Sequence, residues 1–160
     1  SGGSIVLFFS RNKLQPSIEL KHLIEIEDHS GLNDLSTWQR FGVESKKHVQ
    51  SLKSVVVEYA QKNKLVAYGA SARSSTLMNF AGISTQEIDC VIDRNPIKHE
   101  LYTPGTNIPI VSYEKGLQKL DGKHLLLLAW NLEEEIVRDL RESGFKGDMI
   151  VPLPNGVHIR

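Results

Sequence analysis

The sequence predicts an α/β protein in which helices cover both faces of a mostly parallel sheet. Two observations predict this class. Short apolar runs, each the length of a buried strand, recur through the second part of the chain and alternate with segments of helical periodicity. The first run, Leu65–Tyr68, is followed by Gly69 and then by hydroxyl residues suited to begin a helix. A strand, a turn of small residues and a helix form the repeating unit of a doubly wound sheet.

Each predicted strand is bounded by turn residues and is separated from the next by a helix or a loop. The strands cover Leu65–Tyr68, Ile88–Ile92, Ile108–Val111, His124–Ala129 and Asp148–Val151. The predicted helices are Ser71–Ala81, closed by Gly82; Tyr113–Leu120; and Leu132–Ser143, capped by Asn131 and closed by Gly144. Right-handed crossovers between parallel strands favour the strand order 3-2-1-4-5, so we expect a Rossmann-like, doubly wound sheet.

An N-terminal helical segment precedes this region. Apolar residues alternate with charged ones over Pro16–His29, which predicts an amphipathic helix started by its proline. Leu35–Lys62 also has helical periodicity, with Ser36 as its expected N-cap. The aromatic side chains of this longer helix, including Trp38 and Phe41, are expected to pack in the core.

The composition and net charge of the chain exclude several classes of protein. Nineteen basic and nineteen acidic residues cancel over 160 residues. We therefore expect no general attraction to nucleic acid or to an anionic membrane, and any anion site must be local. The longest apolar run, Leu125–Trp130, is too short to span a bilayer, and no signal peptide is visible. The single cysteine, Cys90, lies in a strand pattern and is expected to be a buried structural thiol, which fits a cytoplasmic protein.

Small and polar residues follow the strands at the predicted carboxyl edge of the sheet, where a crevice opens between the first and fourth strands. The helix after Gly69 points its free N–H groups and the positive end of its dipole into this crevice, and Arg73 adds a positive charge. The natural ligand of such a place is an anion, above all a phosphate. The glycine spacing matches neither GxGxxG nor a Walker A loop, so a plain strand–turn–helix connection remains the alternative.

Two residues at this edge have two interpretations each. Asp93 follows the second strand, where a Rossmann domain places the acid that binds a ribose, but it would also suit a turn before Arg94-Asn95-Pro96. Trp130 would stack on a base or sugar, or close the core. No catalytic constellation accompanies them, because the six histidines lack metal-ligand spacing and Glu133–Glu135 reads as a solvated helix start. These residues make up the inventory of a binding site.

Four segments taken together resemble a known family. They are Tyr68–Arg73 with Thr76–Asn79, Asp93–Lys98 with Pro104–Ile110, Leu126–Leu132, and Ile150–Pro154. In order and spacing they are similar to the C-terminal domain of the S-adenosylmethionine-dependent C-methyltransferases that act on nucleotide-linked deoxysugars. The resemblance covers residues 35–154.

The resemblance implies a role and a set of partners. In that family a zinc-binding domain and a methyltransferase domain come first, and the C-terminal domain helps to hold the nucleotide sugar. S-adenosylmethionine, zinc and the catalytic base are therefore expected upstream. The isolated chain is expected to be inactive and to bind no cofactor alone, with a nucleotide-linked sugar and the upstream methyltransferase domain as partners. The substrate-binding positions carried over are Gly69, Ala70, Ser71, Ala72, Arg73, Ser75, Asn79, Asp93, Arg94, Asn95, Lys98, Trp130 and Asn131.

The chain departs from the family motif at Ser71, Arg73 and Ser74, where proline, lysine and glycine are common. Arginine keeps the positive charge but presents it as a planar fork, so the anion site is expected to survive. The departures leave the identity of the nucleotide and of the sugar open.

Three regions are expected along the chain. Residues 1–12, with the apolar strand pattern Ile5–Phe9, resemble the last strand of a preceding methyltransferase domain, or are a remnant left where a longer chain was cut. Residues 13–62 form a helical lead-in that packs on the sheet, and residues 63–160 form the Rossmann-like domain. Two other functions remain open: a stand-alone NAD(P)- or coenzyme A-binding protein, and an interaction module that docks a partner through Leu35–Lys62.

Overall fold

The computed structural model describes residues 6, 8–12 and 14–160. The chain divides into two compact units, one reaching to Ser45 and the other spanning residues 46–160. The strand predicted over Ile5–Phe9 lies partly outside the described residues. Val6, Phe8 and Phe9, which the structure describes, belong to no strand and are exposed, so they do not form the predicted buried strand.

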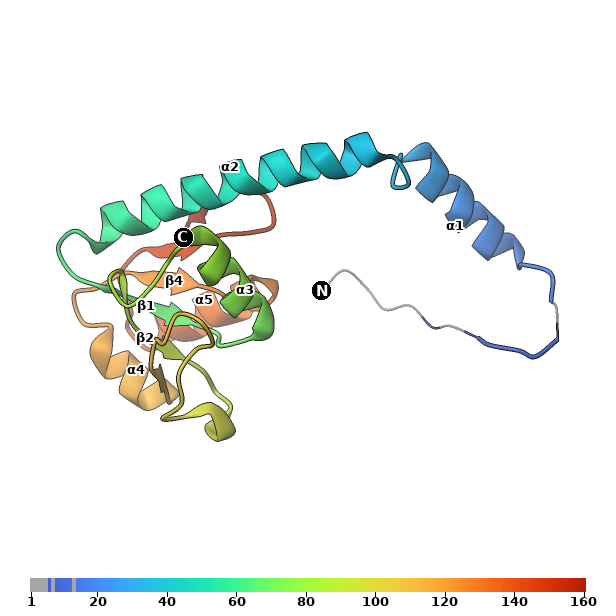
Figure 1. Ribbon diagram of the computed structural model, residues 1–160. Coiled ribbons are helices and arrows are strands. Elements are labelled where there is room, and N and C mark those ends of the chain that lie inside the picture. Colours follow the sequence, from blue (N-terminus) through green and yellow to red (C-terminus); the bar gives the residue numbers. More distant parts are fainter. Residues whose placement is uncertain (1–5, 7, 13) are drawn as a thin grey trace. The chain divides into compact units, whose positions relative to one another are not determined.

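The second unit is built on one six-stranded sheet (Figure 1). Its strands are β1 (Leu65–Tyr68), β2 (Ile88–Ile92), β3 (Ile110–Val111), β4 (Leu125–Leu127), β5 (Met149–Val151) and β6 (His158–Ile159). They lie in the order β3-β2-β1-β4-β5-β6, and the first five are parallel. The predicted order 3-2-1-4-5 is confirmed. The sixth strand, antiparallel to β5, was not predicted.

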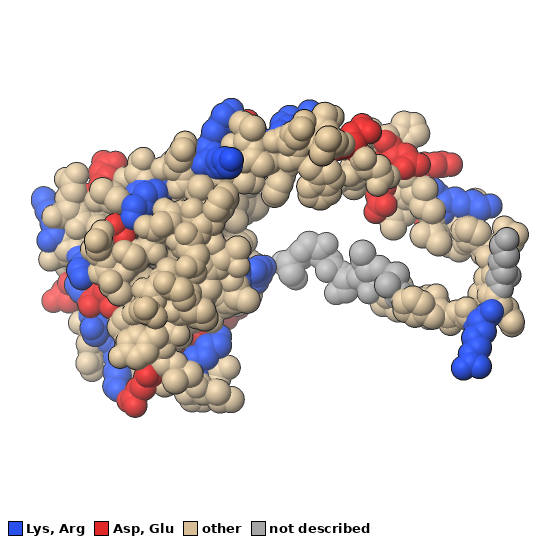
Figure 2. All heavy atoms as spheres, viewed as in Figure 1, with Lys and Arg blue, Asp and Glu red and all other residues tan. Residues whose placement is uncertain are grey.

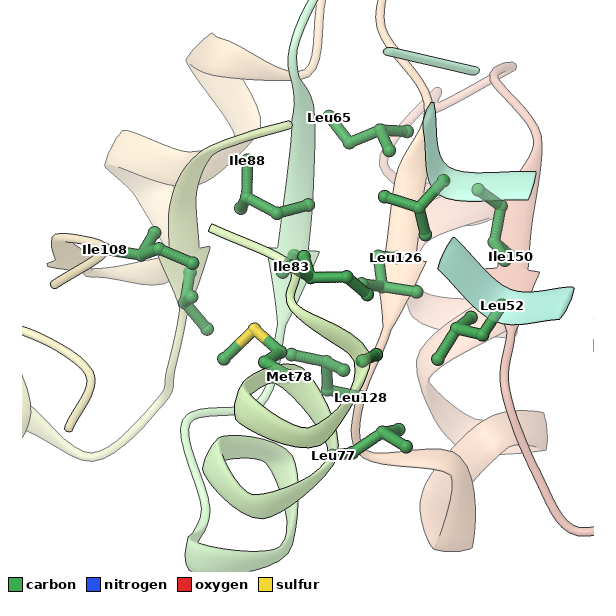
Figure 3. Packing of buried hydrophobic residues seen from close by; sticks show 14 of the residues in the cluster. Leu52, Leu65, Leu77, Met78, Ile83, Ile88, Ile108, Leu126, Leu128 and Ile150 are labelled. Carbon is green, nitrogen blue, oxygen red and sulfur yellow. The ribbon is translucent and has the colours of Figure 1, made fainter. Parts of the chain in front are cut away.

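Two hydrophobic clusters cover the two faces of this sheet. The helices are α2 (Leu35–Ala60), α3 (Ala72–Ala81), α4 (Tyr113–Lys119) and α5 (Glu133–Glu142), with short 3₁₀ turns η1 (Pro96–Lys98) and η2 (Trp130–Leu132). Residues of α2 and α3, such as Leu52 and Met78, point into the first cluster, where they meet Leu126 and Ile150 of the sheet (Figure 3). Residues of α4 and α5 pack into the second cluster. This layering is that of a doubly wound sheet.

Cys90 on β2 is fully buried, as the sequence predicted, and its thiol is free. Burial raises the pKa of this thiol to about 11. A thiol held so far from ionisation is a poor nucleophile at neutral pH, which agrees with a structural role.

The first unit contains α1 (Ile18–His29) and the start of α2. Helix α1 begins after Ser17, which caps it, so the prediction that Pro16 starts the helix is wrong by two residues. Helix α2 begins at Leu35, so Ser36 lies inside the helix and is not its N-cap. A position inside the first turn cannot supply the capping oxygen.

The aromatic side chains at the start of α2 do not lie in the core. Trp38 is 56% exposed and Phe41 is 63% exposed, whereas Val49, Leu52 and Val56 further along the helix are buried. Helical periodicity identifies an apolar face but does not say whether that face is covered.

Among the described residues, no helix is long and apolar enough to cross a membrane.

Candidate functional site

The turn after β1 brings the backbone close to the loop after β4. Gly69 has φ of +102° and its N–H donates to the carbonyl oxygen of Ile92 at 2.8 Å. A Cβ atom added at Gly69 would lie 2.8 Å from the Cβ atom of Ala129. Glycine is therefore required here both by the dihedral angle and by the close approach. This places the start of α3 beside the loop that carries Trp130 and Asn131.

Helix α3 begins with a capping box. The N–H of Ser74 donates to the hydroxyl of Ser71 at 3.2 Å, and the N–H of Ser71 donates to the hydroxyl of Ser74 at the same distance. Within the described part of the chain, the N–H groups of Ala72 and Arg73 have no acceptor. Two backbone donors at the positive end of a helix are thus left without a protein acceptor, which is where the sequence predicted an anion to bind.

Arg73 reaches across to the loop after β4. Its Nη2 atom donates to Oδ1 of Asn131 at 2.9 Å, and its Cζ atom lies 5.5 Å from the centre of the Trp130 ring. Asn131 lies in η2 and makes no helix cap, because α5 begins at Glu133 with Leu132 at the N-cap position. The prediction of Asn131 as an N-cap is therefore wrong. Its side-chain amide accepts a hydrogen bond from Arg73 instead.

Asp93 links the loop after β2 to the turn after β1. Its Oδ2 atom accepts from the N–H of Ala70 at 2.9 Å and from Nζ of Lys98 at 3.0 Å. Its Oδ1 atom accepts from the N–H of Asn95 at 2.9 Å. Lys98 also donates to the carbonyl oxygen of Ala70 at 2.8 Å. Both carboxylate oxygens of Asp93 thus accept hydrogen bonds from other groups of the protein. This favours the interpretation of Asp93 as a turn-forming residue.

Arg94 makes its contacts with α4 and α5, the helices that pack into the second cluster. Its Nη2 atom donates to Oδ2 of Asp139 on α5 at 2.7 Å, and its Cζ atom lies 5.2 Å from the centre of the Tyr113 ring. Burial raises the pKa of Tyr68 at the end of β1, and Arg94, which lowers it, offsets only part of that effect. The guanidinium of Arg94 therefore interacts with side chains of α4 and α5, and it does not join that of Arg73 in the predicted binding site.

Asn79 and Ser75 shape the outer side of α3. The amide of Asn79 donates to the carbonyl oxygens of Ser75 and Pro104, at 2.8 and 2.9 Å. Gly105 packs so closely on this amide that an added Cβ atom would lie 2.2 Å from Oδ1 of Asn79. Asn79 thereby fastens the loop before β3 to α3.

The predicted binding residues thus form two groups that are linked to each other, and two further residues lie outside both groups. One group lies at the start of α3 and in the loop after β4, and the second surrounds Asp93 and is joined to the first through Ala70. Arg94 and Asn79 lie apart from both, each engaged with other protein groups. On the face in view in Figure 2, positive and negative side chains are interspersed over the α/β unit.

Glu133 is one residue that the sequence interpretation missed. It was expected in a solvated helix start, yet its side chain is only 12% exposed and accepts from Arg160 and from His158. It lines a hollow of about 420 Å³ together with Trp130, Asn131 and Leu132. No sequence signal identifies its partners, because they lie on the unpredicted strand β6 and just after it. A larger hollow of about 610 Å³ lies at the opposite edge, around His124 and Phe145.

A family model described as the C-methyltransferase C-terminal domain matches residues 1–154 of the chain. No curated protein matches it.

Proposed function

Because the chain belongs to the C-methyltransferase C-terminal domain family, we propose that it is the part of such an enzyme that binds a nucleotide-linked sugar and that it transfers no methyl group alone. S-adenosylmethionine and the catalytic base then belong to the methyltransferase domain. The observation that carries the proposal is the start of α3, where two free N–H groups and the guanidinium of Arg73 face the carboxyl edge of the sheet. These donors suit the diphosphate of a nucleotide sugar.

The dinucleotide alternative receives less support. A protein that binds NAD(P) through a Rossmann sheet uses a free acid after the second strand for the ribose hydroxyls. Asp93 holds that position, but its two oxygens already accept three hydrogen bonds from Ala70, Lys98 and Asn95. A ribose would have to compete with all three.

A ligand panel followed by protein NMR tests the proposal. Titrations with a thymidine-diphosphate sugar, a UDP-sugar, NAD, coenzyme A and S-adenosylmethionine should shift the resonances of Gly69–Ser75 and Trp130 with the nucleotide sugars only. Arg73→Ala should weaken that binding by about 1.5–3 kcal/mol. It should lower the unfolding free energy by about 0.5–2 kcal/mol, because the contacts of Arg73 with Trp130 and Asn131 are lost as well. Arg138→Ala on α5, where the arginine is exposed, is the matched control. Shifts with NAD or coenzyme A instead would contradict the proposal.

A second function is favoured by the first unit. Helix α1 has twelve residues and buries no side chain, although a helix of this length is marginal by itself in water. Trp38 and Phe41 form an edge-to-face pair with centres 6.1 Å apart, and both are exposed. The indole N–H of Trp38 already donates to the carbonyl oxygen of Leu32, so the ring offers an apolar surface. We propose that this surface binds the methyltransferase domain.

Binding of a methyltransferase domain supplied as a separate chain tests this second proposal. Replacing Trp38 and Phe41 together by alanine should weaken association by about tenfold or more, because buried aromatic anchors dominate interfaces. Phe80→Ala on α3, where the ring is 54% exposed, is the control that removes an aromatic from another surface. Equal effects of both changes would argue against the proposal.

A further inference from the structure

Trp130 supports the guanidinium of Arg73 with its ring. Its side chain is partly buried and packs against both hydrophobic clusters, at the edge where the two faces of the sheet meet. The Arg73 guanidinium carbon lies 5.5 Å from the ring centre, within the range of a cation–π interaction. A base that stacked on the ring face against which the guanidinium lies would have to displace the guanidinium. The ring is therefore a platform for the arginine.

Asn131 restrains the same guanidinium from a second direction. Its Oδ1 atom accepts from Nη2 of Arg73 at 2.9 Å. One end of the guanidinium is thus held, while its other N–H groups have no acceptor within the described residues. Both restraints come from η2 after β4, and Arg73 comes from the first turn of α3. The pair spans the place where the chain reverses direction between β1 and β4.

We infer that Trp130 and Asn131 are positioning residues that hold the guanidinium of Arg73 as a preset fork for the second phosphoryl group of a diphosphate. The inference rests on the proposed function and deepens it. The N–H groups of Ala72 and Arg73 take one phosphoryl group, and the free side of the guanidinium takes the other. A side chain already fixed by a ring and an amide loses less conformational freedom on binding. A nucleoside monophosphate uses only one half of this arrangement, so the site selects diphosphates.

A double-mutant cycle separates positioning from direct contact, with thymidine diphosphate and thymidine monophosphate as probes in calorimetric titrations. Arg73→Ala should weaken thymidine diphosphate binding by about 10- to 100-fold. Asn131→Ala should weaken it by about 3- to 10-fold, and should change monophosphate binding by less than about twofold. In the Arg73→Ala background, Asn131→Ala should have no further effect, because residues that act through one another are not additive. Asn63→Ala, an exposed asparagine before β1, is the control.

A second measurement needs no ligand, so it tests the positioning of Arg73 separately from the proposed function. Rotation of the Arg73 guanidinium is observed through its side-chain nitrogen resonances in the free protein. It should be slow in the wild type, and faster in Asn131→Ala and in Trp130→Leu. If wild-type protein binds neither nucleotide, the proposed function fails and the phosphoryl-binding role of the fork fails with it, while the rotation rates still test whether Trp130 and Asn131 position Arg73. Fast rotation in the wild type overturns the positioning. So does an Asn131→Ala effect that persists without Arg73, since Asn131 then contacts the ligand itself.

Discussion

Ala70 donates its backbone N–H to Oδ2 of Asp93 at 2.9 Å, and this bond joins the turn after β1 to the loop after β2. The ammonium of Lys98 closes the link, because it lies 3.0 Å from the same oxygen and 2.8 Å from the carbonyl oxygen of Ala70. The acid that the sequence offers as a ribose ligand thus holds two loops together at the carboxyl edge of the sheet.

Removing the Asp93 carboxylate should destabilise the protein. Asp93→Ala removes the acceptor of the N–H groups of Ala70 and Asn95, and it removes one of the two acceptors of the Lys98 ammonium. The free energy of unfolding should fall by about 1.5–3 kcal/mol, as measured by denaturant titration. Asp121→Ala, at an exposed aspartate, should change it by no more than about 0.5 kcal/mol. Unchanged stability together with lost binding of ribose-containing ligands would show that Asp93 is a ligand residue.

A side chain at Gly69 should be poorly tolerated. Gly69→Ala combines φ of +102° with a Cβ–Cβ distance of 2.8 Å to Ala129, so it should lower the free energy of unfolding by about 2–4 kcal/mol. Gly122→Ala is the matched variant, because its φ is +63° and an added Cβ atom meets nothing within 4 Å. It should cost about 1 kcal/mol. Equal losses in the two variants would mean that the contact with Ala129 is relieved by a small shift.

Glu87 should make stability depend on acidic pH. Burial alone would raise the pKa of this carboxyl, but hydrogen bonds from Lys53, 2.7 Å away, and from Ser84 outweigh it, so the pKa lies below its ordinary value. A lowered folded-state pKa gives stability that is present above the unfolded pKa, about 4.3, and is lost as pH falls through the folded value.

The comparison of wild type with Glu87→Gln measures this contribution. At pH 7 the variant should be less stable by about 1–3 kcal/mol, and the difference should shrink below about pH 4. Glu142→Gln, at an exposed glutamate on α5, should show no such trend. A difference that stays constant from pH 7 to pH 3 would assign the effect to packing of the side chain and not to its charge.

Cys90 should resist alkylation in the folded protein. Because burial raises its pKa to about 11, the reactive thiolate is rare at pH 8, and the sulfur is also inaccessible. Its reaction with iodoacetamide, followed by mass spectrometry, should be slower than that of the urea-unfolded chain by more than about a hundredfold. Comparable rates in the two states would mean that β2 opens readily.

The sequence was most informative where strands are buried on both faces. Leu65–Tyr68 and Ile88–Ile92 were predicted to the residue, because each is a short, mostly apolar run bounded by turn residues, which is typical of a buried strand. Strand β6 was missed, since His158–Ile159 has no apolar pattern of its own and exists by pairing with β5. The exposure of Trp38 and Phe41 was also missed, because the same apolar periodicity marks a core face and an interface.

The candidate site was predicted as a set of residues and not as a set of contacts. Topology alone brings the residues after β1, β2 and β4 to one edge, so their assembly could be expected. Which partner each one takes depends on distances across the fold. The turn of Arg94 toward Asp139, and the pairing of Arg73 with Asn131, join residues 45 and 58 positions apart, and local patterns carry no information at that range.

The packing of Trp130 against both clusters gives the protein a built-in optical reporter. The chain has two tryptophans, so Trp38→Phe leaves a single indole at the junction of the two cores and under the guanidinium of Arg73. The emission of that indole depends on solvent and on a nearby positive charge. One fluorescence trace would therefore follow two events in the same sample: melting of the sheet, and the arrival of an anion at the guanidinium that lies against the ring.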